Sequence, residues 1–475
     1  MTRAKHPDPT RALLALPEFR ALLTARGLAA LSMTAITTVV AFQTYEVTGE
    51  PLALGLLGLV EAIPALALML LGGHVADRRD RRSIILVTGS LLVLGTLALA
   101  LMSLDPAGIS FAGILAVIFL IGIAAGFERP ALVAFEAQVI PVEHASRGAS
   151  LSGATWTAAA IVGPAVGGLA IAFIGIPATY LALAVIMAIS VVAVTHIGRK
   201  STPEPKAGES VVSSLTGGVR YVVGHQVLLG SMALDLFAVF FGGAIALLPV
   251  FASDILGVGP IGLGLLRTAP SVGALLSMLA TTHIPPRRNA GTLLLGFVTV
   301  FGVSMVVFGL STSFLLSLLA LFVAGLADGV SMVIRLVILR VESPEELRGR
   351  IAAVNHLFIG ASNELGAFES GVAATLIGVV PAVVVGGFVT IAVVGIVAVL
   401  APDLRRLDLG RRLVEGPGVQ PLVRTRAQPL AAGSSGSNIA AAEIDPGLEP
   451  TLDAVEHIAD DDAKISPTEP EAPRT

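Results

Sequence analysis

Several ionisable side chains of this 475-residue sequence fall inside long apolar runs, where such residues usually have a functional role. Placing one charge in hydrocarbon costs about 3 kcal/mol, so we expect these residues to face a wet interior or to pair. A buried carboxyl can bind and release protons near neutral pH. The proton-coupling candidates are Glu128, Glu61 and Asp235, in that order. The alternative is a structural ion pair, and Asp235 with Arg267 is a possible one.

Two predicted helices repeat a seven-residue spacing of opposite charges. Arg129 and Glu136 show it in one, and Asp328 and Arg335 show it in the other with the signs exchanged. Seven residues are two helical turns, about 10 Å of rise, which predicts that each pair lines a cavity wall rather than forming an ion pair. Glu136 lies near a helix end, where a structural role is expected. The full set of cavity or charge-pair candidates also contains Arg26, Arg267, Glu364 and Glu369.

The segment 351–378 is unusually polar for a membrane span. Asn355, Ser362 and Glu369 recur every seven residues, and Asn363 lies on the adjoining line. Such a stripe would be expensive against lipid, so we expect it to line the cavity. The alternative is that these side chains only join helices by hydrogen bonds.

The elements that position these residues are organised around one basic loop, GGHVADRRDRR at 72–82. It separates two apolar runs, 52–71 and 83–104, each about long enough to cross a bilayer. The positive-inside rule places such a loop in the cytoplasm. The other loops predicted on that side hold Arg147, Arg199, Lys200, Lys206, Arg220, Arg287, Arg288, Arg348 and Arg350, and the opposite loops hold no basic residue. This asymmetry indicates an even number of helices with both termini cytoplasmic.

Composition indicates an all-α polytopic membrane protein. The chain is 54% hydrophobic and only 13% charged, and its mean hydropathy is +0.86. Continuous apolar runs argue against a barrel, whose strands alternate. The 51 glycines suit helices that pack closely in lipid. Because the chain has no cysteine, disulfides and thiolate metal sites are excluded.

Twelve membrane helices are predicted, in two halves of six. Shifting the sequence by 203 places Gly126 on Gly329, Pro141 on Pro344, Arg147 on Arg350 and Gly163 on Gly366, which indicates duplication and a transporter architecture. The predicted helices are 21–47, 52–73, 83–104, 109–139, 150–174, 178–197, 225–252, 261–284, 291–310, 314–341, 351–378 and 380–401. The predicted domains are a cytoplasmic segment 1–20, an N-terminal half 21–197, a cytoplasmic linker 198–224, a C-terminal half 225–401 and a largely disordered cytoplasmic tail 402–475.

Over about residues 15–402 the chain resembles the major facilitator superfamily of transporters. Its basic loop matches the family signature Gly-x-x-x-Asp-Arg-x-x-Arg-Arg and departs from it at Asp80, where Gly is usual. An Asp there is similar to the branch that includes the enterobactin exporter and macrolide-efflux-like proteins. The resemblance implies that these residues gate the cytoplasmic side, whereas the alternative is that the arginines only anchor orientation. The matching residues are Gly73, Asp77, Arg78, Arg81 and Arg82.

A second motif, GPAVGG, resembles the helix 5 motif of proton antiporters that export drugs. It comprises Gly163, Pro164, Gly167 and Gly168. Independently of that resemblance, glycine and proline at these positions predict a bent helix with a closely packed neighbour.

These observations predict a secondary active transporter in a bacterial-type inner membrane, working by alternating access. We expect proton-coupled export of a drug- or siderophore-like amphipathic compound by a monomer, with no cofactor, no metal and no nucleic-acid partner. No nucleotide-binding or catalytic motif is present, which argues against an enzyme. The alternatives are an importer or facilitator of a small metabolite on the same fold, and a transport-inactive scaffold or sensor.

Overall fold

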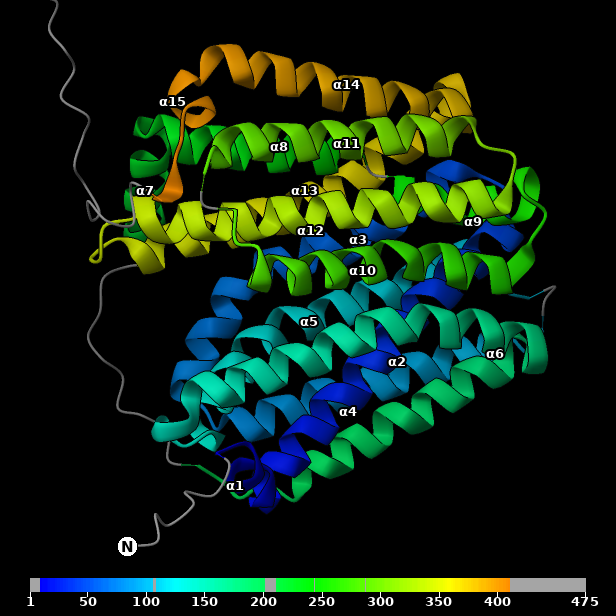
Figure 1. Cartoon of the computed structure of the whole chain (residues 1–475). Coiled ribbons are helices and arrows are strands. Elements are labelled where there is room, and N and C mark those ends of the chain that lie inside the picture. Colours follow the sequence, from blue (N-terminus) through cyan, green and yellow to red (C-terminus); the bar gives the residue numbers. More distant parts are fainter. Residues whose placement is uncertain (1–8, 106–107, 201–210, 243, 287, 411–475) are drawn as a thin grey trace, which may run out of the picture. The chain divides into compact units, whose positions relative to one another are not determined.

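The computed structural model describes residues 9–105, 108–200, 211–242, 244–286 and 288–410, and over these ranges the chain is helical, with no strand. The predicted all-α class is therefore confirmed. The described helices belong to one compact unit (Figure 1). They are α1 (Pro9–Ala15), α2 (Pro17–Thr48), α3 (Pro51–Arg78), α4 (Arg81–Met102), α5 (Phe111–Val139), η1 (Val142–His144), α6 (Ala145–Thr195), α7 (Val211–Gly224), α8 (Gln226–Phe241), η2 (Ala244–Leu247), α9 (Leu248–Val250), η3 (Phe251–Ile255), α10 (Gly259–His283), α11 (Ala290–Leu310), α12 (Phe314–Glu342), α13 (Arg348–Ile377), α14 (Val379–Leu400) and α15 (Pro402–Arg405).

Local sequence signals set several of the helix ends. Proline opens α2 and α3, where its missing N–H costs nothing. The Ser110 side chain caps α5 by accepting a hydrogen bond from Gly113 N at 3.1 Å. Gly49 ends α2 in the left-handed region, with φ of 65°. Long apolar runs between such signals therefore become single helices.

Within the described ranges, ten helical segments are long and apolar enough to cross a membrane. One of them contains α6, which breaks at Gly175 (φ 76°, ψ 170°) into two arms, each long enough for its own crossing. The two arms lie near the α6 label in Figure 1. The thirty-residue α13 is long enough but too polar to be among the ten. Counting α6 twice and adding α13 is consistent with the predicted twelve crossings.

The break at Gly175 has a counterpart in the other half. Gly378, between α13 and α14, also has positive φ, at 93°. The two glycines are 203 residues apart, the same shift that aligns the sequence repeat. Both positions need a residue without a Cβ, since φ in this range strains any other L-residue. The backbone of these two turns therefore matches the predicted sequence repeat.

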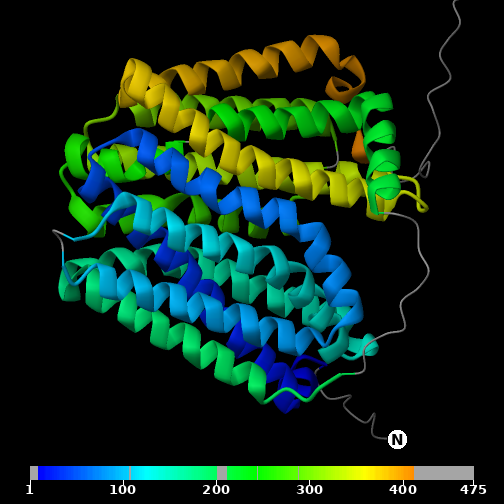
Figure 2. The same cartoon turned by 180° about the vertical axis from the view of Figure 1, so that it is seen from behind.

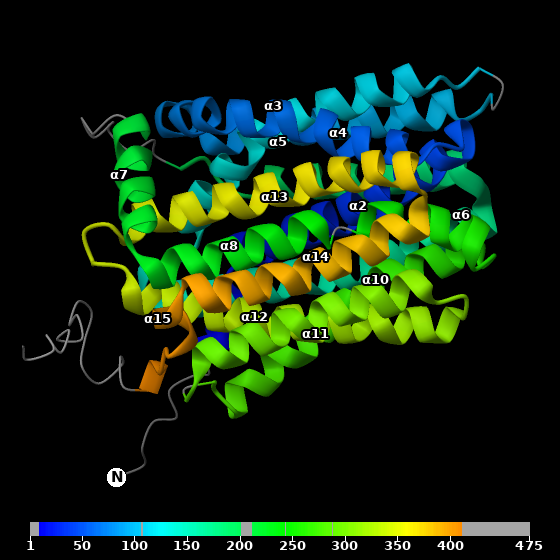
Figure 3. The ribbon, with the colours of Figure 1, turned by 90° about the horizontal axis from the view of Figure 1, so that it is seen from above.

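The two ends of the helix bundle differ in their basic residues, so we call the end that carries them the basic end and the end whose turns carry none the neutral end. The basic end carries the loop at 79–80 and the segments at 196–200 and 343–347, and the neutral end carries Gly49, Gly175 and Gly378. At the basic end α7 runs across the ends of the long helices, as Figures 2 and 3 show. It occupies most of the second part of the predicted linker.

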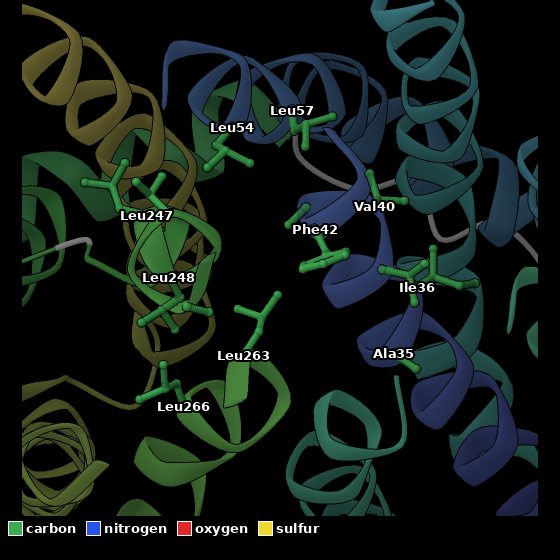
Figure 4. Close-up of a cluster of buried hydrophobic side chains, with 14 of the residues drawn as sticks. Ala35, Ile36, Val40, Phe42, Leu54, Leu57, Leu247, Leu248, Leu263 and Leu266 are labelled. Atoms are coloured by element: carbon green, nitrogen blue, oxygen red, sulfur yellow. The ribbon is translucent and has the colours of Figure 1, made fainter. Parts of the chain in front are cut away.

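Among the described residues, the buried apolar cluster that joins the halves lies at the neutral end. One buried cluster combines residues of α2, α3, α5 and α6 with residues of η2, α9, α10 and α12. Figure 4 shows Phe42 of α2 and Leu263 of α10 pointing toward each other across this junction. Two further clusters fill the basic ends, and each stays within one half. Within the described residues the halves therefore share a core on the neutral side and have separate cores on the basic side.

Two predicted elements differ from the structure, and a third lies mostly outside the described residues. The predicted helix 225–252 is divided, because α8 ends at Phe241 and η2, α9 and the π-helical η3 follow. The first membrane helix starts at Pro17, inside the predicted N-terminal segment. Most of the predicted tail, residues 411–475, lies outside the described residues.

Candidate functional site

A cavity of about 490 Å³ lies between the halves of the bundle. It is lined from α2, α3 and α5 on one side and from α8, η2, α10, α11, α12 and α13 on the other. Most of the lining is apolar, for example Met33, Ile36 and Leu57. The polar and charged side chains in the lining are Thr37, Glu61, Arg267, Asp328, Asn363 and Glu364.

Two carboxylates meet where α3 of one half crosses α13 of the other. A Cβ on Gly58 would lie 2.8 Å from Glu364 Oε2, so the carboxylate occupies the space that the glycine leaves free. Glu61 lies one turn further along α3, in the same cavity, and it interacts electrostatically with Glu364. The crossing therefore places acidic groups from both halves at one site.

The helix α5 contributes two further ionisable residues, Glu128 and Arg129. Arg129 attracts Glu61, Glu128 and Glu364 electrostatically, so one cation serves three carboxylates. Its side chain is exposed, while the three carboxylates are partly buried. We call the group Glu61, Glu128, Arg129 and Glu364 the carboxylate cluster. Its charge is unbalanced when all three acids are ionised.

Arg267 of α10 enters the same cavity without an acidic partner among the described ion pairs. Its Nη1 donates to Thr38 Oγ1 of α2 at 3.3 Å, near the long limit for such a bond. Its Nε is buried and has no hydrogen-bond partner. The predicted possible pair with Asp235 does not form.

Asp235 pairs instead with Arg335 of α12. Asp235 Oδ1 lies 2.8 Å from Arg335 Nη2; the Asp235 side chain is buried, at 8% exposure, and the Arg335 side chain is mostly buried, at 14%. The same Nη2 lies 3.4 Å from Asp328 Oδ1, and Nη1 donates to Ser331 Oγ at 2.9 Å. The prediction that Asp328 and Arg335 are too far apart to pair is therefore wrong, because the arginine side chain extends along the helix and covers much of the two-turn rise.

Arg26 of α2 forms an ion pair with Glu136 of α5. Glu136 therefore pairs with a residue of a neighbouring helix and not with Arg129 of its own helix. Both residues belong to the N-terminal half, toward its basic end. This pair is separate from the cavity lining.

The polar stripe of α13 divides between the cavity and the helix itself. Asn363 and Glu364 line the cavity. Ser362 is buried and donates to the carbonyl oxygen of Ile359 in its own helix, at 3.0 Å. Asn355 and Glu369 are partly buried and lie outside the cavity lining.

The signature loop lies at the basic end of α3 and α4. Asp77 Oδ1 and Arg81 Nη2 are 4.0 Å apart, with the Asp77 side chain 73% exposed and Arg81 7% exposed. Arg78 ends α3 and is exposed. A Cβ on Gly73 would meet no atom within 4 Å, so packing does not require glycine there.

Asp80 and Arg82 have clear structural roles in this loop. The Asp80 side chain caps α4, accepting hydrogen bonds from Arg82 N at 3.2 Å and Ser83 Oγ at 2.7 Å. Arg82 donates to the carbonyl oxygens of Val194 and Thr195 at the end of α6, at 3.3 and 2.8 Å. The loop therefore ties α3, α4 and α6 together within the N-terminal half.

The helix 5 motif lies where α6 meets two other helices. A Cβ on Gly163 would approach Thr34 of α2, and one on Gly167 would lie 3.0 Å from the carbonyl oxygen of Ala35. A Cβ on Gly168 would lie 2.3 Å from the carbonyl oxygen of Pro260, at the start of α10. Glycines in this motif therefore allow both an intra-half and an inter-half crossing, and Pro164 is buried between them.

Sequence reasoning missed polar contacts between the halves, and one of them is at the neutral end. Tyr45 of α2 donates a hydrogen bond to Asp254 of η3 at the neutral end. Tyrosine is rare in this chain, with three residues in total, and Asp254 is an isolated acid in a neutral loop. Both residues could be singled out in the sequence, but no pattern in it predicted that they contact each other.

Within the described residues, no three His, Asp or Glu side chains group closely enough to hold a metal ion.

Comparison with known proteins gives a consistent answer. The family model described as Major Facilitator Superfamily matches residues 22–367. The chain is 25% identical over 390 residues to the multidrug efflux pump Tap of Mycolicibacterium fortuitum, covering 79% of this chain and 94% of that protein. It is 24% identical over 339 residues to the enterobactin exporter EntS of Shigella boydii serotype 18 (strain CDC 3083-94 / BS512), covering 70% of this chain and 80% of that protein.

The fold is also shared with solved transporter structures. A bacterial homologue of the human lysosomal transporter Spinster, inward-facing and unoccupied, superposes with a TM-score of 0.63 at 15% identity, covering 86% of this chain and 98% of that one. At this identity the likeness shows the fold alone.

Proposed function

Because this chain belongs to the major facilitator superfamily and is a multi-pass inner-membrane transporter, we propose that it couples proton entry to the export of an amphipathic compound. The observation that carries the proposal is the meeting of Glu61 and Glu364, from opposite halves, at one wall of the central cavity. Both walls of the cavity come from one chain, so the proposal needs only a monomer.

The carboxylate cluster can link protonation to movement of the halves. Glu61 and Glu364 repel each other while both are ionised, and a bound proton removes that repulsion. Glu61 and Glu364 lie on different halves. The number of protons bound at the crossing of α3 and α13 therefore changes the free energy of the contact between the halves there. Coupling needs such differential stabilisation of two states.

Charge asymmetry and packing together suggest which state is present. The positive-inside rule assigns the basic end to the cytoplasm. The halves share their core at the neutral end, so the cavity is closed toward the outside and the chain faces inward. In this state an exporter would take up its substrate from the cytoplasm or the inner leaflet.

The signature loop would act in the opposite state. We assign Asp77, Arg78, Arg81 and Arg82, with Gly73 in the same loop, to a gate that closes when the basic ends of the halves meet. The exposure of Asp77 supports this assignment, because its side chain is 73% exposed and its 4.0 Å ion pair with Arg81 leaves most of the carboxylate accessible to a partner in the other half.

Export is supported by the names of two relatives, one an efflux pump and one an exporter. The apolar lining of the cavity, with few charges, suits an amphipathic compound. An importer of a small polar metabolite would need a more polar lining.

The test is transport by purified protein in liposomes with an imposed pH gradient. We expect gradient-driven accumulation of at least one dye from a panel of anionic, neutral and cationic amphipathic fluorophores. Glu61→Gln and Glu364→Gln should reduce it more than tenfold. The control is Glu369→Gln, which alters a carboxyl on α13 outside the cavity lining.

Three outcomes would count against the proposal. Failure of every dye to move in either orientation would exclude coupled transport of this class. Full gradient-driven transport by Glu61→Gln, Glu364→Gln, Glu128→Gln and Asp235→Asn would show that the coupling site lies elsewhere. Movement only down the dye gradient, independent of pH, would favour a facilitator.

A further inference from the structure

Arg267 differs from other arginines within the membrane helices. Arg26 pairs with Glu136, and Arg335 pairs with two aspartates. Arg267 is the one cation in the cavity lining of the described residues, and its recorded hydrogen bond goes to the neutral hydroxyl of Thr38. A guanidinium carries five N–H donors, so most of its donors are available to another group.

The position of Arg267 is fixed by tight packing one turn away. Gly264 of α10 packs against Gly168 of α6, where a Cβ on Gly264 would lie 2.7 Å from the carbonyl oxygen of Pro164. The next residue, Thr268, donates to the carbonyl oxygen of Ile161 at 3.0 Å. Arg267 is therefore held at the junction of the halves, and its presence in the cavity is built into the crossing of α6 and α10.

The surroundings of Arg267 define what could satisfy it. Apolar side chains supply most of the cavity lining, and the acidic groups Glu61 and Glu364 belong to the crossing of α3 with α13. Asp328 also lines the cavity, but it is engaged by Arg335. A ligand with an apolar body and one acidic group would gain contact with the apolar lining and a charge-assisted hydrogen bond from the guanidinium.

We propose that Arg267 binds the acidic group of the transported compound, so that the substrates are amphipathic acids such as carboxylates. This rests on the proposed transport function, because it identifies the cavity as the substrate site. The carboxylate cluster then has the further effect of repelling the acidic group of the ligand, which directs that group toward α10. Bound substrate would bridge Arg267 and Thr38, which belong to different halves.

The test measures binding of matched probes to the purified full-length chain in detergent. Dansylglycine carries a carboxylate, dansylglycinamide is its neutral counterpart, and dansylcadaverine is cationic. From the strength of hydrogen bonds to charged groups, we expect the carboxylate to bind roughly tenfold or more tightly than the amide. Arg267→Met should remove this preference and leave amide binding within about twofold.

Two further variants control for charge and folding. Arg147→Met removes one positive charge from an exposed position at the basic end, far along the chain from α10, and should behave as the wild type. Arg267→Lys keeps the charge but lacks the planar donor fork, so it should weaken carboxylate binding several-fold and leave amide binding unchanged. If Arg267→Met does not fold, this lysine variant decides the question.

Equal binding of carboxylate and amide by the wild type would overturn the inference, as would preference for the cationic probe. An undiminished carboxylate preference in Arg267→Met, or equal weakening of both probes in Arg267→Lys, would also overturn it. The measurement uses no pH gradient. Carboxylate selectivity that depends on Arg267 can therefore survive when proton coupling fails, and the two proposals are tested separately.

Discussion

Replacing Gly168 by alanine is expected to open the neutral end of the bundle. The added Cβ would lie 2.3 Å from the carbonyl oxygen of Pro260, 3.0 Å from Gly264 Cα and 3.1 Å from Gly264 N. Ordinary contact begins at 3.4 Å, so the first distance is about 1 Å too short. Because the opposing atoms are backbone, no side chain can rotate away, and α6 and α10 must separate.

The size of the effect follows from the cost of overpacking. Inserting a methyl group into a packed site typically costs about 1–3 kcal/mol. That cost falls only on the state in which the neutral ends are in contact, so it shifts the equilibrium between the two states by roughly 5-fold to 150-fold. The basic ends should approach each other as the neutral ends separate.

Because the chain has no cysteine, spin labels can be placed freely. One label pair, at Leu104 and Leu376, reports on the neutral end, and the other, at Val142 and Ile284, reports on the basic end; all four side chains are exposed. Pulsed electron spin resonance should show longer distances for the first pair and shorter distances for the second in Gly168→Ala.

The matched control is Gly153→Ala on the same helix, where a Cβ would meet no atom within 4 Å. Both substitutions raise intrinsic helix propensity equally, so the comparison isolates the contact with α10. Distance distributions that are the same in the two variants would refute the reasoning.

Two further predictions concern stability. Arg335→Met should destabilise the detergent-solubilised protein by about 3–5 kcal/mol, because it leaves Asp235 buried without its cation. Adding Asp235→Asn should restore most of this loss. Thermal unfolding of the single and double variants measures both effects, and simply additive effects of the two substitutions would contradict the prediction. Asp80→Ala should lower the free energy of unfolding by about 1 kcal/mol, because the cap on α4 is lost. Asp80→Gly, which introduces the residue usual in the family signature, should lower it by only a few tenths of a kcal/mol. Equal shifts in unfolding temperature for the two variants would exclude a capping role.

The sequence predicts the helices well because apolar runs and turn residues act locally. The predicted range 291–310 differs from α11 (Ala290–Leu310) by one residue at its start. The division of the seventh predicted helix after Phe241 was not predicted, because the residues on both sides of the break are apolar and a continuous apolar run predicts one helix. The glycine that ends α8, Gly242, follows Phe241 directly and was the local signal for the break.

The candidate site was predictable as a set of residues but not as a set of contacts. The cost of buried charge singled out Glu61, Arg267 and Glu364, and the structure places all three in the cavity lining. Which cation serves which acid depends on helix rotation and side-chain reach. Asp235 therefore meets Arg335 of α12 rather than Arg267 of α10, and helical spacing within one segment could not show it.

The polarity of α13 also bears on how the protein is made. A helix that carries Glu364, Glu369 and two asparagines does not partition into lipid readily by itself. Its Gly366 packs against the backbone of Phe240 in α8, and the strongly apolar α14 follows directly after Gly378. Stable insertion of α13 thus depends on helices made earlier and on one made immediately afterwards. The side of the cavity formed by α13, which carries Glu364, is completed only when the ribosome has almost finished the membrane part of the chain. The cavity therefore forms as a late step of biogenesis.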